Sequence, residues 1–360
     1  MSIPEAVIQG AVARYHREYD RYLKLCARVA EICRLEIVEG NAIRAQVTSR
    51  AKSPKSLEGK LRRFSAGGKK EMPTIDSVFD QIRDLAAVRI ATYEQKHESQ
   101  VAEEVCKRFV GEGAQKPAKE VKDKHAENQE HFYRATHCEV FLTSGDLVGT
   151  YVNVAGVPCE IQVCSMMAHV WNEVEHDLGY KPLSGELSAL EKQLLVALGH
   201  NSRSGDGMIS QLLAATDQRQ IAQTNAFSDV YDFVARVRQW YPGTEFARHA
   251  GPLFEQLVAL RLVTLDSLQR IIQNPDLETT RTKLQALSTT LRTGSDNKFE
   301  LDENSADLLL VVLLPHIAKY LVKANVTDLS GGAARIRWIA ERFIEIEDAR
   351  TRERQNAPAT

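Results

Sequence analysis

The chain has 360 residues, which exceeds the usual size of one domain and predicts two domains, or one domain with a large extension. Hydrophobic residues make up 43% of it and charged residues 26%, so collagen-like, coiled-coil and disordered classes are excluded. With Lys+Arg 46 against Asp+Glu 48, the formal net charge is -2. This balance excludes the global positive field of a dedicated nucleic-acid coat protein, so any polyanion site must be a local patch.

The N-terminal residues, the apolar runs and the cysteines predict a cytoplasmic protein with no membrane partner. The first ten residues lack the basic-then-apolar order of a signal peptide, and the longest apolar run, residues 308–314, is too short to span a bilayer. The six cysteines form no CxxC pair, which favours buried free thiols over disulfide or zinc frameworks.

The N-terminal part begins with helical periodicity. Apolar residues recur at three- and four-residue steps over residues 3–39 and predict one long amphipathic helix that ends at Gly40. Residues 42–49 predict a short strand, and Ser53-Pro54 is typical of the first residues of another helix.

The middle of the chain alternates between strands and helices. Residues 85–91 form a short apolar run that predicts a buried strand, followed by a helix over residues 98–110. The lysine-rich stretch 111–130 contains no clear element. After it we expect three successive strands and a closing helix, over residues 138–143, 147–154, 157–163 and 166–178.

These elements predict an α+β fold with three parts. Residues 1–185 are expected to form a mixed β-sheet flanked by helices, together with the N-terminal helix. Residues 186–352 show helical periodicity almost throughout and predict an all-α region, and residues 353–360 are expected to be a disordered tail.

Basic residues gather where the first predicted strand ends. Arg50 and Lys52 leave that strand on one face, and Lys60 follows within the next helix. Guanidinium and ammonium groups neutralise phosphate oxygens, so the cluster could hold a triphosphate. A solvated basic face is the alternative.

Acidic residues are placed near two other predicted strands. Asp84 and Arg89 bracket an apolar stretch, where a charge needs a cation or hydrogen bonds to compensate it. Glu160 and Gln162 alternate on one strand and therefore share one face. A buried salt bridge would explain either carboxylate alone. Two carboxylates facing a basic cluster also suit an oxygen-coordinated Mg²⁺ that bridges nucleotide phosphates.

Taken in order, these clusters resemble the synthetase domain of the RelA/SpoT family, the ATP-dependent pyrophosphokinases that make alarmone nucleotides. The resemblance covers about residues 40–182, and five pieces in the family's order carry it: RAKSPKSLEGK (50–60), DLAAVRI (84–90), YRATH (133–137), EIQV (160–163) and AHVWNEVEHDLGYK (168–181).

The resemblance implies a role for each matching residue. It assigns Arg50 and Arg89 to the adenine of ATP, Lys52 and Lys60 to its phosphates, and Asp84 to Mg²⁺. Glu160 would complete the metal site or take the proton of the acceptor 3′-hydroxyl. Three residues would form the acceptor pocket, with Tyr133 stacking on the base: Tyr133, His137 and Gln162.

The acceptor loop departs from the family pattern. The family normally has Lys-x-Asn-Gly-Tyr before its His, whereas residues 129–133 read QEHFY, so the lysine and the Asn-Gly pair are missing. Lys119, Lys122 and Lys124 lie upstream and could supply the lost charge, or they could belong to a solvated loop.

Three hypotheses follow. The leading one is transfer of the β,γ-pyrophosphate of ATP to the 3′-hydroxyl of GDP or GTP. The second, favoured by the altered loop, is a toxin-like enzyme that pyrophosphorylates the 3′ end of tRNA. The third assigns the C-terminal helical region to interaction, either with a regulatory protein that gates the synthetase or in a homo-oligomer.

Overall fold

The computed structural model describes residues 3–68, 70–111, 115–126, 128–179, 187–273, 275–292, 299–323 and 331–356. The chain divides into two compact units, each of which takes a part of the N-terminal segment. The first unit comprises Met1–Ile37 and Arg44–Ser210, and the second comprises Val38–Ile43 and Gln211–Thr360. The boundary expected between residues 185 and 186 lies outside the described residues, and helix α7 crosses from the first unit into the second.

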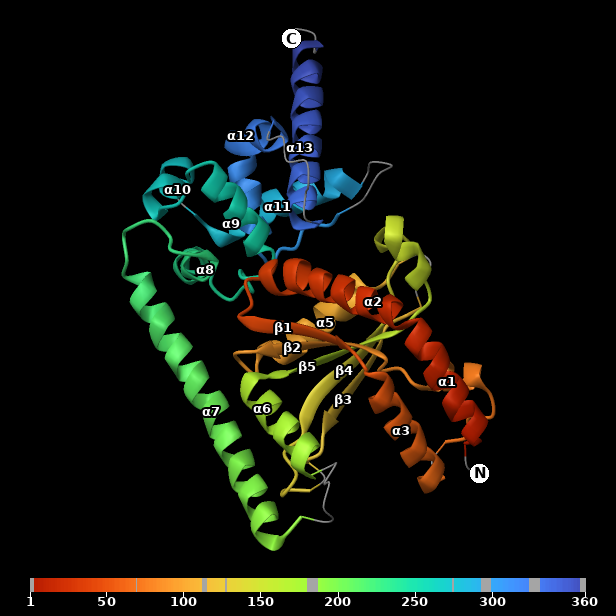
Figure 1. Ribbon diagram of the computed structural model, residues 1–360. Coiled ribbons are helices and arrows are strands. Elements are labelled where there is room, and N and C mark those ends of the chain that lie inside the picture. The colour runs from red at the N-terminus through yellow and green to blue at the C-terminus, as the bar shows by residue number, and fades with distance from the viewer. Residues whose placement is uncertain are drawn as a thin grey trace. The chain divides into compact units, whose positions relative to one another are not determined.

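The first unit combines helices with one sheet, as Figure 1 shows. Its elements are α1 (Glu5–Arg17), α2 (Tyr19–Ile32), β1 (Ala45–Ala51), α3 (Pro54–Gly67), α4 (Ile75–Gln81), β2 (Ala86–Thr92), α5 (His97–Arg108), β3 (Ala118–Asp123), β4 (Arg134–Val140), β5 (Cys159–Ser165), α6 (Met166–Val174) and α7 (Ala189–Ile221), which continues beyond the unit.

The sheet is mixed, and its strand order is β1-β2-β5-β4-β3. Strands β2 and β5 pair in parallel, and the other neighbours are antiparallel. The predicted α+β fold, with a mixed sheet followed by a helical region, is therefore confirmed.

Alternation along the strands gives the sheet one apolar and one polar face. Val88, Ile90, Ile161, Val163 and Cys138 are buried on the same face. Helices α2 and α5 pack against the strands on that side, whereas α6 packs on the other (Figure 1). The polar face is thus only partly covered, which leaves room for functional side chains.

Two expectations for this unit are wrong. Residues 147–154 do not form a strand: 3₁₀ turns occupy Ser144–Asp146 and Gly149–Val154, and the Asp146 carboxylate accepts hydrogen bonds from Thr143 and from the guanidinium of Arg108. The stretch 111–130 does contain an element, β3. This strand lies at the sheet edge and is mostly exposed, so it has no apolar alternation to reveal it.

The N-terminal helix is also divided. The sequence predicted one helix over residues 3–39, but α1 ends at Arg17, α2 begins at Tyr19, and a π-helical segment covers Cys33–Glu39. Glu18 sits at the break outside α-helical geometry. Both helices bury apolar side chains in the core of the first unit, so the apolar spacing continues across the break. Periodicity alone could therefore not locate the break.

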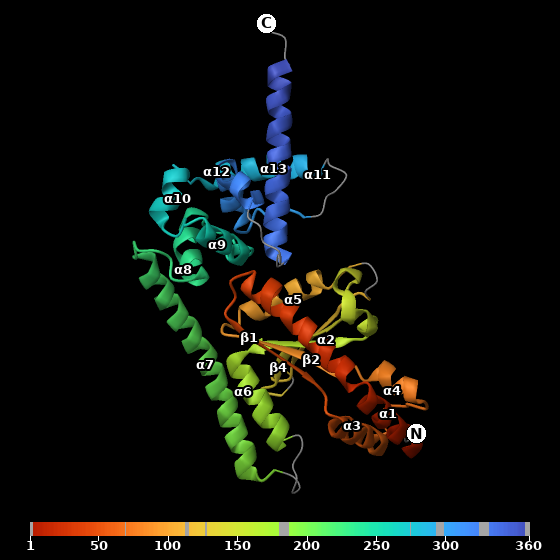
Figure 2. The same cartoon turned by 45° about the horizontal axis from the view of Figure 1, so that its top comes forward.

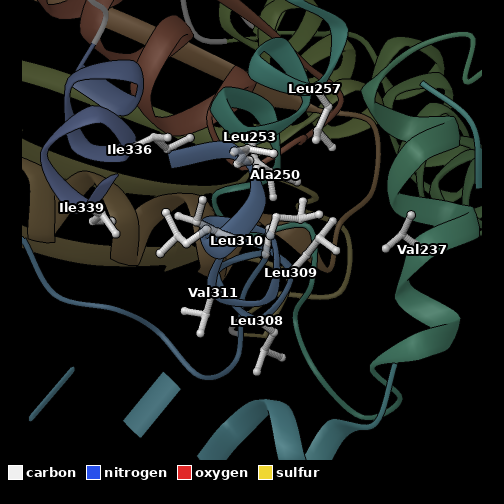
Figure 3. Close-up of a cluster of buried hydrophobic side chains, with 14 of the residues drawn as sticks. Val237, Ala250, Leu253, Leu257, Leu308, Leu309, Leu310, Val311, Ile336 and Ile339 are labelled. Carbon is white, nitrogen blue, oxygen red and sulfur yellow. The ribbon is translucent and has the colours of Figure 1, made fainter. Parts of the chain in front are cut away.

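The second unit is helical. Its elements are α8 (Val230–Val237), α9 (Ala250–Ala259), α10 (Leu265–Ile271), α11 (Leu277–Arg292), α12 (Asp307–Lys323) and α13 (Gly331–Asn356). Helix α13 includes residues 353–356, which the sequence assigned to the tail. Figure 3 shows the core, where α12 contributes consecutive leucines that meet side chains of α9 and α13. Within the described residues, no helix has the length and apolar content that crossing a membrane requires.

A buried carboxylate joins three segments of the second unit. Asp307, at the start of α12, accepts hydrogen bonds from Arg335 of α13 at 2.8 Å, from Nδ1 of His249 at 3.3 Å and from the backbone N–H of Asp302 at 2.8 Å. Burial in itself raises the pKa of Asp307, but the charges of Arg335 and His249 outweigh it and hold that pKa far below its usual range.

We predict that Asp307→Ala lowers the free energy of unfolding by about 3–5 kcal/mol, because Arg335 is then left buried without its partner. Urea denaturation followed by circular dichroism measures the change. Glu278→Ala, which removes an exposed pair with Arg281, is the control and should cost less than about 1 kcal/mol. Since folding depresses the pKa of Asp307, its contribution is complete above about pH 4 and falls as the pH decreases further. Equal losses in both variants would contradict the prediction.

Candidate functional site

Strand register brings the predicted site residues of the sheet onto its polar face. Arg89 of β2 is opposite Gln162 of β5, and Gln162 is in turn opposite His137 of β4. Glu160, two residues before Gln162, therefore shares this face. Arg50 of β1 is paired with Ala87, which is itself paired with Glu160, so Arg50 belongs to the same row.

Two lysines and one aspartate form the first charged group. Nζ of Lys60 lies 2.8 Å from Oδ2 of Asp84, and Nζ of Lys52 lies 3.1 Å from the same oxygen. Burial in itself raises the pKa of Asp84, but Lys60 and Lys52 outweigh it and hold that pKa below its usual value. Burial lowers the pKa of Lys52, against the opposing charge of Asp84. All three groups are partly desolvated, which strengthens the attraction of the two ammonium groups for an anion.

Hydrogen bonds to the backbone hold this group in place. The hydroxyl of Tyr15 donates hydrogen bonds to the carbonyl oxygens of Lys52 and Leu85, at 2.7 and 3.2 Å, and the N–H of Lys52 donates to Leu85 at 2.8 Å. Helix α3 begins at Pro54, where the Ser53 side chain caps the N–H of Ser56 and directs the helix that carries Lys60. Lys52, Lys60 and Asp84 thus meet although they come from three segments.

A chain of hydrogen bonds forms the second group. Nδ1 of His137 lies 2.9 Å from Oε1 of Glu160, and Nε2 of His137 lies 2.8 Å from the hydroxyl of Tyr133. A neutral imidazole protonated at Nδ1 donates to Glu160 and accepts from Tyr133. Gln162 donates to the other Glu160 oxygen at 2.7 Å. Burial in itself raises the pKa of Glu160, but the hydrogen bond from His137 leads the effects that hold it below its usual value.

Arg89 lies between this chain and helix α6. Its guanidinium is 2.7 Å from Glu173 and donates to Gln162 at 3.4 Å. A small cavity of about 80 Å³ opens beside it, lined by Thr48, Ser49, Arg50, Ala87, Val88, Arg89 and Gln162. Arg50 and Arg89 therefore line one cavity. No role was assigned to Glu173 from the sequence, although it lies within the piece AHVWNEVEHDLGYK that carries the family resemblance.

The upstream lysines differ in position. The Lys124 ammonium lies 5.1 Å from the centroid of the Tyr133 ring, a cation–π arrangement, while Lys122 pairs with Glu120. Lys119 is exposed on the edge strand β3. Lys124 thus brings a positive charge to Tyr133, where the loop lacks the family's lysine.

The carboxylates of Asp84 and Glu160 fit a divalent cation whose other ligands are phosphate oxygens. Oδ1 of Asp84 is buried and has no hydrogen-bond partner, and the charge of Asp84 is close enough to raise the pKa of Glu160. Within the described ranges, no group of three or more His, Cys, Asp or Glu side chains is arranged for a metal. Carboxylate oxygens with phosphates and water are the ligands that Mg²⁺ prefers.

The cysteines stand apart from this site chemistry. All six are free, and burial raises the pKa of Cys26 to about 11 and that of Cys164 to about 12. Protonated, buried thiols are poor nucleophiles and metal ligands.

The site therefore consists of two lysines around one aspartate and a separate hydrogen-bonded carboxylate, both in a domain with a mixed sheet, which is a charge pattern typical of domains that bind phosphate groups. The family comparison gives the particular family: residues 49–184 match RelA_SpoT, described as a region found in RelA / SpoT proteins. This part of the chain is therefore a RelA/SpoT synthetase domain, of pyrophosphokinase type, followed by a helical region.

Comparison with known proteins gave no match among curated sequences, but several among solved structures. The chain is similar to a GTP pyrophosphokinase family protein from Streptococcus pneumoniae (19% identity, TM-score 0.42, covering 55% of this chain and 92% of that one). It is also similar to the small alarmone synthetase 1 from Bacillus subtilis (20% identity, TM-score 0.44, covering 57% and 98%).

We predict that His137→Ala raises the pKa of Glu160, because the variant loses the hydrogen bond that lowers this pKa while burial, which raises it, stays. A pH titration of ¹³C-labelled glutamate carboxyl groups by NMR measures the shift. His316→Ala is the control, because His316 is exposed on α12 of the second unit. An unchanged Glu160 titration in the His137 variant would show that the hydrogen bond does not control this carboxylate.

Proposed function

We propose that the chain is an ATP-dependent pyrophosphokinase that transfers the β,γ-pyrophosphate of ATP to the 3′-hydroxyl of GDP or GTP. The observation that carries this proposal is the occurrence of the Lys52–Lys60–Asp84 group and the Tyr133–His137–Glu160 chain in one RelA/SpoT synthetase domain, where the charge of Asp84 acts on Glu160. One group suits a triphosphate, and the other suits an acceptor whose hydroxyl must lose a proton.

In this proposal the two groups divide the reaction. Lys52 and Lys60 neutralise the ATP phosphates, and Arg50 and Arg89 line the cavity beside the adenine. The acceptor 3′-oxygen forms a bond to the β-phosphorus, and the bond from that phosphorus to the α,β-bridging oxygen breaks. AMP leaves with that oxygen, and Glu160 takes the hydroxyl proton. RelA/SpoT synthetases use Mg²⁺, which Asp84, with Glu160 near it, would hold and which would neutralise further phosphate charge.

Glu160 is available as a proton acceptor. Burial in itself raises its pKa, but the hydrogen bonds from His137 and Gln162 hold that pKa below its usual value, so the carboxylate is ionised at neutral pH. Tyr133, whose pKa burial raises, stays a neutral phenol that can stack on an acceptor base. Its hydroxyl is already bonded to His137, so the ring is restrained before an acceptor arrives.

A second acceptor, the 3′ end of tRNA, is supported by the lysines at the edge of the sheet. Lys124 lies over Tyr133, and Lys119 is exposed on β3. Dispersed phosphate contacts of this kind suit a polymer as well as a nucleotide. The two acceptors require the same transfer chemistry and differ only in what contacts these lysines.

The sequence also assigned the C-terminal helical region to a regulatory protein or a homo-oligomer, and this stays a prediction. A cavity of about 820 Å³ among α11, α12 and α13 supports it. Its lining includes Lys283, Lys319 and Lys323, beside apolar side chains such as Leu314 and Phe343.

We predict that the chain, incubated with Mg²⁺, γ-labelled ATP, GDP, GTP and total tRNA, releases AMP and labels a guanine nucleotide at its 3′-hydroxyl. Mass analysis of the products identifies the acceptor. Glu160→Gln should lower the rate at least about 100-fold, because the proton acceptor is lost. Glu58→Gln, on the outer side of α3 with Arg62, should keep the wild-type rate.

This experiment distinguishes a wrong acceptor from a wrong transfer reaction. Label on tRNA alone would replace the guanine nucleotide with the second acceptor. Release of ADP without a pyrophosphorylated product would overturn the proposed transfer itself.

A further inference from the structure

We propose that Asp206 of helix α7 is a positioning residue for the acceptor end of the site, which it holds through Arg134. Asp206 lies beyond residues 49–184, the part that matches the family. The inference rests on the proposed function for the role of Tyr133, whereas the contacts that carry it stand on their own.

A buried ionic network connects α7 to the start of β4. The Arg134 guanidinium lies 3.2 Å from Oδ2 of Asp206 and 2.9 Å from Glu98 of α5. The Ser165 hydroxyl, at the end of β5, donates to Asp206 at 3.0 Å. The side chains of Arg134, Asp206 and Glu98 are only 13%, 7% and 11% exposed, so their interactions are little screened by solvent.

Arg134 controls the orientation of Tyr133 through strand alternation. Neighbouring strand residues point to opposite faces, so an anchored Arg134 side chain leaves Tyr133 and His137 on the polar face. If the pairing of β4 shifted by one residue, Tyr133 and His137 would point to the opposite face of the sheet. The carbonyl oxygen of Arg134 also accepts a hydrogen bond from Asn172 of α6 at 3.1 Å, which fixes the backbone at the same point.

Close packing of α7 supplies a second, independent observation. A Cβ atom at Gly199 would lie 2.2 Å from ring carbons of Phe132, the residue before Tyr133. A Cβ atom at Gly205 would lie 2.5 Å from the Met167 side chain of α6. The indole N–H of Trp171 donates to the carbonyl of Leu195 at 3.0 Å. Figure 2 shows α7 beside α6, consistent with these contacts.

The network is better suited to fixing geometry than to adding stability. One guanidinium serves two carboxylates, and Oδ1 of Asp206 and Nε of Arg134 are buried without a hydrogen-bond partner. Burial raises the pKa of Glu98, with Arg134 opposing and Asp206 reinforcing the shift. Incompletely satisfied buried charges contribute little net stability, but they specify one arrangement of the elements they join.

The first test is steady-state kinetics of the full chain with Asp206→Ala. We expect kcat/KM for the acceptor to fall about 10- to 100-fold, as misplacement of a binding group produces, while KM for ATP stays unchanged. Gly199→Ala, which displaces Phe132, should act in the same direction. Asp217→Asn, on the same helix and paired with Arg238, is the matched control and should leave both constants unchanged. Equal changes in the ATP and acceptor constants would indicate a merely structural role and overturn the inference.

The second test does not depend on transfer activity. Hydrogen–deuterium exchange should become faster in Asp206→Ala over residues 131–137 and stay unchanged in β1 and β2. If the wild-type chain transfers nothing, the proposed function fails while exchange still decides whether Asp206 holds this segment. Unchanged exchange over residues 131–137 would overturn the inference in either case.

Discussion

The parallel register between β2 and β5 is the constraint on which the site depends. It sets Arg89 beside Gln162 and Ala87 beside Glu160, so side chains more than 70 positions apart share one face. The antiparallel pairing of β1 with β2 and of β4 with β5 places Arg50 and His137 on the same face. A shift of one residue would turn these polar groups into the apolar layer under α2 and α5, where burial without partners is costly. Folding and site assembly therefore have the same cause.

The two groups of the site differ in charge, which suits the two reactants of the proposed transfer. Lys52 and Lys60 share one Asp84 oxygen, so the group carries an excess positive charge and one unpartnered carboxylate oxygen. At the other end, the Glu160 carboxylate is held by hydrogen bonds from His137 and Gln162. In the proposed transfer, such preorganised groups would not need to reorient as negative charge moves along the phosphates.

Hydropathy patterns predicted the mixed sheet, and strand alternation together with the family resemblance predicted residues that the structure places on its polar face. They failed where tertiary contacts decide the structure. The edge strand β3 has no buried face and so no alternation, and the turns near Asp146 depend on Arg108 from a distant helix. The partner Asp206 lies on a helix outside the quoted motifs, where one acidic residue is indistinguishable from a solvated one.

Anomalous diffraction from crystals grown with Mn²⁺ and a non-hydrolysable ATP analogue would locate the metal ion and the phosphates in one experiment. We expect a manganese ion bound to the Asp84 carboxylate, with the analogue's phosphates against Lys52 and Lys60 and with Glu160 on the acceptor side. Phosphates bound elsewhere, or a metal ion that has no contact with Asp84, would be incompatible with the proposed site.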